Sequence, residues 1–264
     1  MKYPGHVIKV GEQDARIVKA LKVQLNRALA VQRIADLRLK VDDPSFGPKM
    51  KQAVQLFQVR NVDARGNPLR PDGEVGSITW AALFGPASVS SSDAAVDPYL
   101  ASVLEVAAGE EARQVREQPQ NSNRGPEVEQ YLRRVGLGPG FAWCCAFVYW
   151  CFDEAAKAAH RADPMFRTAG CLAHWNNAPA VGARRIMRSQ AVADPSLVKP
   201  GMVFVMDFGG GNGHTGLVES LSGGLLTTIE GNTDASMTRE GGGVYRLHRK
   251  VGDINKGFID YAGL

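Results

Sequence analysis

The chain has 264 residues, which is long enough for one large domain or two of moderate size. A hydrophobic fraction of 44% with 22% charged residues is ordinary for a globular protein, and no apolar run reaches the length of a membrane-spanning helix. Residues 1–87 hold 14 Lys and Arg against 8 Asp and Glu, whereas residues 88–264 hold 17 against 19, so the front of the chain carries the excess positive charge. That excess indicates either an anionic partner or a solvated basic face.

Neither the start of the chain nor its cysteines indicate an exported, disulfide-bonded protein. The first six residues lack the apolar core of a signal peptide, so we expect a protein made in the cytoplasm and carried to its site of action by another route. The four cysteines form neither a disulfide framework nor paired zinc-ligand spacing; they are Cys144, Cys145, Cys151 and Cys171. The pair Cys171 and His174 lacks a second ligand pair, and we expect a structural role there, reduced thiols, no metal and no cofactor.

Residues 1–85 have the apolar spacing of a small all-α domain with three helices. The first helix is expected around Leu21 and Leu25, the second after Pro48, and the third from about Ser77 to the stop at Gly85. Two segments in this region also resemble each other. Each has an Asp-headed turn, an apolar residue, a glycine and then a helix, at residues 43–58 and 72–83. This repetition predicts two stacked helical hairpins.

These motifs resemble the peptidoglycan-binding domain found on many wall hydrolases. The residues that carry the resemblance lie within residues 14–85; they are Leu21, Gln24, Leu25, Phe46, Gly47, Ala53, Val54, Phe57, Gln58, Asp72, Gly73, Val75, Gly76, Thr79, Trp80 and Leu83. Most of these positions are core positions, so the resemblance concerns the fold more directly than the ligand. The alternative is a helical module that has lost wall binding.

A linker of small residues, 86–97, leads into a second domain of a different kind, residues 98–264. Helices are expected at 99–111, 128–135 and 142–160. Strands are expected at 202–208, 215–221, 225–230, 244–248 and 258–261. Helices followed by consecutive strands predict an α+β fold with an antiparallel sheet.

Cys144 is the candidate nucleophile of this second domain. A reactive cysteine needs a lowered pKa and a neighbouring base. The predicted helix places Cys144 in its first turn, as the third residue, where the helix dipole favours a thiolate. The adjacent Cys145 is the alternative, but it would point about 100° away around the helix, toward the core.

His214 is the candidate base, and the strand pattern suggests its partner. It follows the glycine-rich turn 209–213 and begins a strand. With a hairpin loop at 222–223 or at 222–224, the antiparallel register places His214 opposite residue 231 or 232. In either register His214 meets the segment from Glu230 to Asn232, where a carboxylate or amide could orient the imidazole.

Three motifs in this domain resemble those of CHAP domains, which are cysteine-dependent amidohydrolases and peptidases of the papain-like superfamily. The motifs occur in the family's order, as residues 143–150 (WCCAFVYW), 213–218 (GHTGLV) and 229–233 (IEGNT). The resemblance implies that Cys144 is the nucleophile, His214 the general base, Glu230 the orienting carboxylate and Asn232 an auxiliary polar group.

The two resemblances together predict a two-domain, endolysin-like peptidoglycan hydrolase. It would cleave an amide bond in the peptide part of the wall, with an endopeptidase slightly favoured over an N-acetylmuramoyl-L-alanine amidase. A non-catalytic wall-binding protein is the alternative of a different class. We expect a monomer whose partner is peptidoglycan, with no nucleic acid partner and no membrane insertion. It would reach the wall either as a phage lysin released through a pore or as an injected effector.

Overall fold

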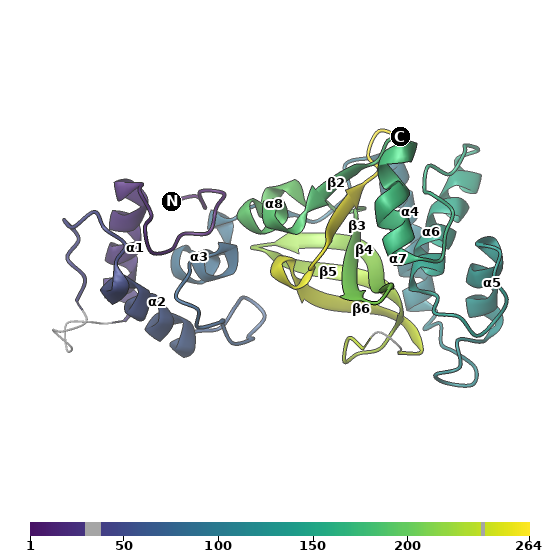
Figure 1. Cartoon of the computed structure of the whole chain (residues 1–264), viewed down its shortest axis with the longest axis horizontal. Coiled ribbons are helices and arrows are strands. Elements are labelled where there is room, and N and C mark those ends of the chain that lie inside the picture. The colour runs from purple at the N-terminus through teal and green to yellow at the C-terminus, as the bar shows by residue number, and fades with distance from the viewer. Residues whose placement is uncertain (30–37, 239–240) are drawn as a thin grey trace. The chain divides into compact units, whose positions relative to one another are not determined.

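The computed structural model describes residues 1–29, 38–238 and 241–264 (Figure 1). The chain divides into two compact units, which are described separately. The first unit comprises Met1–Ser91, Val192–Pro195 and Ser222–Gly224. The second comprises Ser92–Ala191, Ser196–Leu221 and Leu225–Leu264.

The described part of the first unit is built mainly from helices. They are α1 (Ala15–Ala28), α2 (Pro48–Arg60), α3 (Ser77–Phe84) and the short 3₁₀ helix η3 (Pro86–Ser88). The Asp14 side chain caps α1 by accepting hydrogen bonds from two backbone N–H groups, and Pro48 occupies the first position of α2. Gly85 ends α3 with a φ of 89°, a conformation that a residue with a side chain rarely adopts. The apolar positions that predicted these helices lie in one buried cluster.

The two Asp-headed turns of this unit are each held by a buried polar side chain. Lys22 donates to both the carbonyl and the carboxylate of Asp43. The amide of Gln58 donates to the Asp72 carboxylate and accepts from the N–H of Gly73. These bonds connect each turn to a helix, because buried polar groups need partners.

The second unit contains helices and a sheet. Its helices are α4 (Pro98–Ala112), α5 (Pro126–Arg134), α6 (Cys144–Ala158), α7 (Cys171–Asn177) and all but the last two residues of α8 (Arg188–Ala193). Its longer strands are β2 (Arg184–Met187), β3 (Val203–Gly209), β4 (Asn212–Ser222), β5 (Leu225–Thr233), β6 (Gly243–Lys250) and β7 (Gly257–Asp260), and β1 (Ser91–Ser92) has two residues. Figure 1 shows α4, α6 and α7 beside the sheet, with α5 packed on α6.

The sheet has the strand order β2-β7-β3-β4-β5-β6, and β2–β7, β3–β7, β3–β4 and β5–β6 pair antiparallel. The α+β class with an antiparallel sheet is therefore present, but the strands are not simply consecutive, because β7 returns to lie between β2 and β3. Three elements were not predicted from the sequence: β2, α7 and α8. Strand β2 has only one buried residue, Ile186, so it lacks the alternation that reveals a strand.

Candidate active site

Helix α6 begins with Cys144 itself. The expected start at Ala142 was wrong by two residues, since Trp143 is the N-cap and Cys144 is the first helical residue instead of the third. Trp143 is buried, and its indole N–H donates to the Glu117 carboxylate at 2.8 Å. This bond fixes the residue just before Cys144, so the thiol is held at the positive end of the α6 dipole.

Cys144 and Cys145 have different surroundings although they are adjacent. The thiol of Cys145 is fully buried and donates to the carbonyl of Thr168 at 3.4 Å. Cys144 retains a 3% exposure and interacts with His214. The structure therefore brings Cys144, and not Cys145, to the predicted base.

His214 is positioned by two hairpins. The β3–β4 hairpin turns at Gly210 and Gly211, which both have positive φ, and His214 then pairs with Met206 in β3. The turn before β5 consists of Gly223 and Gly224, which lies within the wider of the two expected loops, 222–224, and one position later than the other, 222–223.

The side chain of His214 is hydrogen-bonded to the carboxylate of Glu230, which the hairpin places beside it. Its Nε2 lies 2.7 Å from Oε2 of Glu230, which belongs to the segment that both expected registers placed opposite His214. Nδ1, the other ring nitrogen, is buried and has no hydrogen-bond partner among the described residues, so it is the nitrogen that remains available to the Cys144 thiol. His214 thus connects the thiol on α6 with the carboxylate on β5.

Two motif glycines allow this close packing. A Cβ on Gly216 would lie 2.7 Å from Cγ of Glu230, so the bare backbone of β4 leaves room for that side chain. A Cβ on Gly231 would lie 2.7 Å from the Trp143 ring and 2.8 Å from that of Phe147. Glycine at 231 therefore lets β5 approach the first turn of α6, which brings Glu230 and Cys144 into one site.

Glu230 is a buried carboxylate that is held by several donors. Arg249 on β6 donates from Nε and from its terminal nitrogen, both at 2.6 Å, and Thr228 donates from its hydroxyl. Burial raises the pKa of Glu230, but the bonds from Arg249 and His214 outweigh it and lower this pKa to about 2. Glu230 is therefore an anion at neutral pH.

The titrations of Cys144 and His214 are coupled. The contact with Cys171, together with burial, raises the pKa of the Cys144 thiol, and the interaction with His214 opposes both. Burial lowers the pKa of His214, but Cys144 and Glu230 outweigh it and raise this pKa to about 9. Each group thus favours the charged form of the other, which is the condition for a thiolate–imidazolium pair.

Asn232 lies two residues beyond Glu230 in β5. It is buried, and its φ of 58° places it in the left-handed region at the point where the β5–β6 register shifts. Asn tolerates this conformation better than most residues, and such backbone outliers gather at functional sites. The structure thus places all four predicted site residues in the first turn of α6 or on β4 and β5.

Two further residues reach this site without having been predicted. The thiol of Cys171, the first residue of α7, lies 3.5 Å from that of Cys144, so the purely structural role expected for Cys171 omitted its contact with the nucleophile. Arg249 lacked a motif altogether. The neighbouring His174 does not join the site, since it is buried against the Tyr261 hydroxyl at 2.6 Å, and burial lowers its pKa to about 3.

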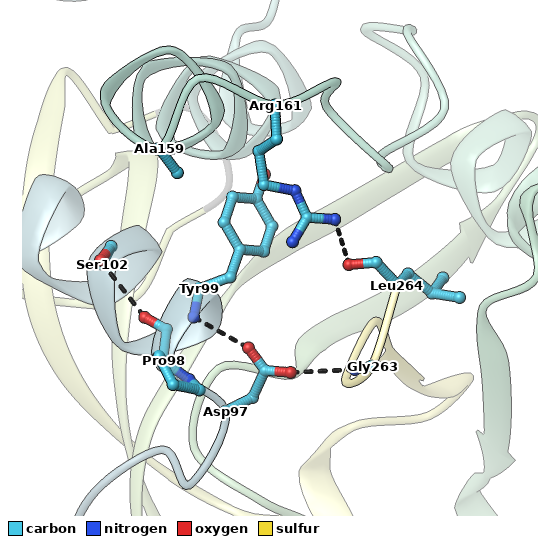
Figure 2. Close-up of a pocket in the computed structure, with 8 residues that line it drawn as sticks. All are labelled: Asp97, Pro98, Tyr99, Ser102, Ala159, Arg161, Gly263 and Leu264. Carbon is cyan, nitrogen blue, oxygen red and sulfur yellow. Dashed lines mark hydrogen bonds between the residues drawn. The ribbon is translucent and has the colours of Figure 1, made fainter.

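Elsewhere in the second unit, a cavity of about 610 Å³ is lined by residues of α4, the end of α6 and the last residues of the chain (Figure 2). Its polar groups bond one another: Asp97 accepts from the N–H groups of Tyr99 and Gly263, and Arg161 donates to the carbonyl of Leu264. No predicted nucleophile or base lines this cavity. Across residues 1–29, 38–238 and 241–264, no three His, Cys, Asp or Glu side chains are arranged to hold a metal ion.

Residues 136–232 match the family described as the CHAP domain. This segment contains all four predicted site residues, with Asn232 at its end. No curated protein and no solved structure matches the chain. The match supports a cysteine- and histidine-dependent amidohydrolase or peptidase with peptidoglycan as its substrate. In the described ranges, every helix is too short or too polar to cross a lipid bilayer.

Proposed function

We propose that the protein is a peptidoglycan hydrolase that cleaves an amide bond in the peptide part of the wall. In this proposal Cys144 is the nucleophile, His214 the general base, Glu230 the orienting carboxylate and Asn232 an auxiliary group. The observation that carries the proposal is the placement of His214, which interacts with the Cys144 thiol and bonds Glu230 at 2.7 Å inside the matched segment. Such an arrangement suits acyl transfer, because a thiol, a base and a fixed carboxylate are its minimal set.

The reaction has two halves. His214 takes the thiol proton, the sulfur of Cys144 attacks the carbonyl carbon, and a tetrahedral oxyanion forms. The C–N bond then breaks as the leaving amine takes the proton from His214, which leaves a thioester on Cys144. In the second half His214 removes a proton from water, the hydroxide attacks the thioester, and the acid product leaves as the thiol is restored. The backbone N–H of Cys144 is the candidate donor to the oxyanion.

The scissile bond is identified by mass spectrometry of purified sacculi digested with the full chain. We favour an endopeptidase, so the expected products are muropeptides cut within the stem or the cross-link. Free stems released from intact glycan strands would instead identify an N-acetylmuramoyl-L-alanine amidase. An unchanged digest, identical to that of Cys144→Ala, would overturn the hydrolase proposal and favour a wall-binding protein without activity.

We also propose that residues 1–85 form a three-helix, repeat-like domain that binds peptidoglycan. A cavity of about 480 Å³ at the ends of α1 and α3 is lined by Gln24, Arg27, Ala28, Leu83 and Phe84. An exposed guanidinium beside an aromatic ring suits the carboxylates and sugar faces of the wall polymer.

The binding proposal is tested with the full chain carrying Cys144→Ala, so that sacculi remain intact. Arg27→Glu should weaken co-sedimentation with sacculi several-fold. Lys19→Glu, the same charge change on an exposed residue of α1 that does not line the cavity, is the control and should bind normally. Equal binding by both variants would remove this cavity from the proposal.

A further inference from the structure

Arg249 makes the most complete contact with the Glu230 carboxylate. Its guanidinium covers both oxygens, with Nε on Oε1 and the terminal nitrogen on Oε2, each at 2.6 Å. The carboxylate is fully buried, the arginine is only 8% exposed, and the guanidinium carbon lies 5.5 Å from the centre of the Phe204 ring. Arg249 is fixed on β6 opposite Leu226 of β5. The contact is therefore a rigid, desolvated fork instead of a surface ion pair.

This bidentate contact reduces the net negative charge beside the His214 imidazole. Oε2 of Glu230 is shared between Nε2 of His214 and the guanidinium, so the negative charge beside the imidazole is partly compensated. Without the guanidinium, a buried carboxylate would have the imidazole as its remaining cationic partner. Burying an uncompensated charge is costly, so the Glu230–His214 pair would then bind a proton more tightly.

We propose that Arg249 is a positioning residue that keeps Glu230 ionised and aimed at Nε2, and that weakens the hold of this carboxylate on the His214 proton. This inference rests on the proposed function, because it assumes that Cys144 must give its proton to His214. Glu230 alone would hold the His214 proton more tightly and make the imidazolium a poorer proton donor to the leaving amine. The guanidinium offsets that attraction while it keeps the carboxylate aimed at Nε2.

Alkylation of Cys144 by iodoacetamide measures this effect without any wall substrate. The rate of modification at Cys144, followed by peptide mass spectrometry from pH 5 to 10, reports when the thiol–imidazole pair loses its shared proton. Arg249→Gln should move the midpoint to higher pH and slow alkylation at pH 7 by roughly tenfold or more, which corresponds to one pH unit. The acid limb of muropeptide hydrolysis should move in the same direction.

The chain offers a matched control on the same strand. Arg246 also forks onto a carboxylate, that of Glu219, at 2.8 and 3.0 Å, but this pair is partly exposed and outside the site. Arg246→Gln should therefore leave the alkylation midpoint unchanged. Arg249→Lys keeps the charge and loses the fork, so its midpoint should fall between those of the wild type and Arg249→Gln.

If Arg249 has only a structural role, Arg249→Gln should lower the Tm and the maximal rate while the pH midpoint of Cys144 alkylation stays unchanged. That result would overturn the proposal. If Arg249→Gln does not fold, Glu230→Gln is compared with Glu230→Gln/Arg249→Gln, since neither has an uncompensated buried carboxylate. Loss of the guanidinium should again raise the midpoint, and no shift in this background would also overturn the proposal. Because alkylation needs no peptidoglycan, failure to cleave sacculi would refute the proposed function without deciding the role of Arg249.

Discussion

Replacing Glu230 by glutamine tests the charge balance of the site with almost no change in shape. The wild-type carboxylate accepts from His214 Nε2 and from Arg249, and glutamine can accept through its single amide oxygen only. The substitution removes the anion that favours the imidazolium and leaves the Arg249 cation unopposed. Both changes act in the same direction, so the pKa of His214 should fall.

The size of this effect follows from the environment of His214. Burial lowers the pKa of this residue, and the raised pKa of about 9 exists because Cys144 and Glu230 outweigh burial. Without Glu230 the pKa should drop toward the ordinary 6.5, a loss on the order of 3 kcal/mol of imidazolium stabilisation. If much of this stabilisation is lost from the reactive thiolate–imidazolium pair, kcat/KM should fall by about 10- to 100-fold.

The direction of the pH shift distinguishes a lowered His214 pKa from a general loss of structure. A lower His214 pKa keeps the basic imidazole available at lower pH, so the acid limb of the profile should move down while the maximal rate falls. The profile is measured on one defined muropeptide, with Glu219→Gln as the control because that carboxylate pairs with Arg246 outside the site. A Glu230→Gln enzyme with an unchanged rate and acid limb would refute a catalytic role for this carboxylate.

Four smaller predictions concern neighbouring residues. Cys144→Ala should abolish wall lysis in a folded protein, whereas Cys145→Ala should retain most activity, and the reverse result in a lysis assay would identify Cys145 as the nucleophile. Cys171→Ala should move Cys144 alkylation to lower pH, because the Cys171 contact raises the pKa of that thiol; an unmoved alkylation midpoint would contradict this. Asn232→Ala should lower the muropeptide rate with less movement of the acid limb than Glu230→Gln, and equal movement would give Asn232 a charge-related role. Gly231→Ala should lower Tm in thermal unfolding by overlapping with the α6 rings, and an unchanged Tm would show that β5 can move aside.

Local patterns predicted the elements that carry the site. The apolar run after Trp143 predicted α6 to within two residues at each end, and the glycine-rich segments predicted both hairpin turns to within two residues. The contact between His214 and Glu230 could be predicted because two adjacent strands joined by a tight turn have few possible registers. The choice between the two expected loops did not matter, since the neighbouring carboxylate side chain is long enough to reach the imidazole.

Contacts between elements that are distant in the sequence could not be predicted in this way. Cys171 meets Cys144 only because α7 packs beside α6, and no spacing rule connects residues 27 positions apart. Arg249 is 19 residues from Glu230 and belongs to a strand whose pairing with β5 contains an irregularity between Glu230 and Thr233. Register counting from that turn would have failed at the irregularity.

The charge of Arg249 nevertheless follows from a rule that does not require the register. A carboxylate placed in the middle of an apolar sheet, between Ile229 and a glycine that packs on aromatic rings, must be compensated by hydrogen-bond donors or by a cation. His214 cannot supply a permanent positive charge if it is to exchange a proton with Cys144. A buried catalytic carboxylate next to a working imidazole therefore needs further hydrogen-bond donors or a second, non-titrating cation, and here the Arg249 guanidinium provides both.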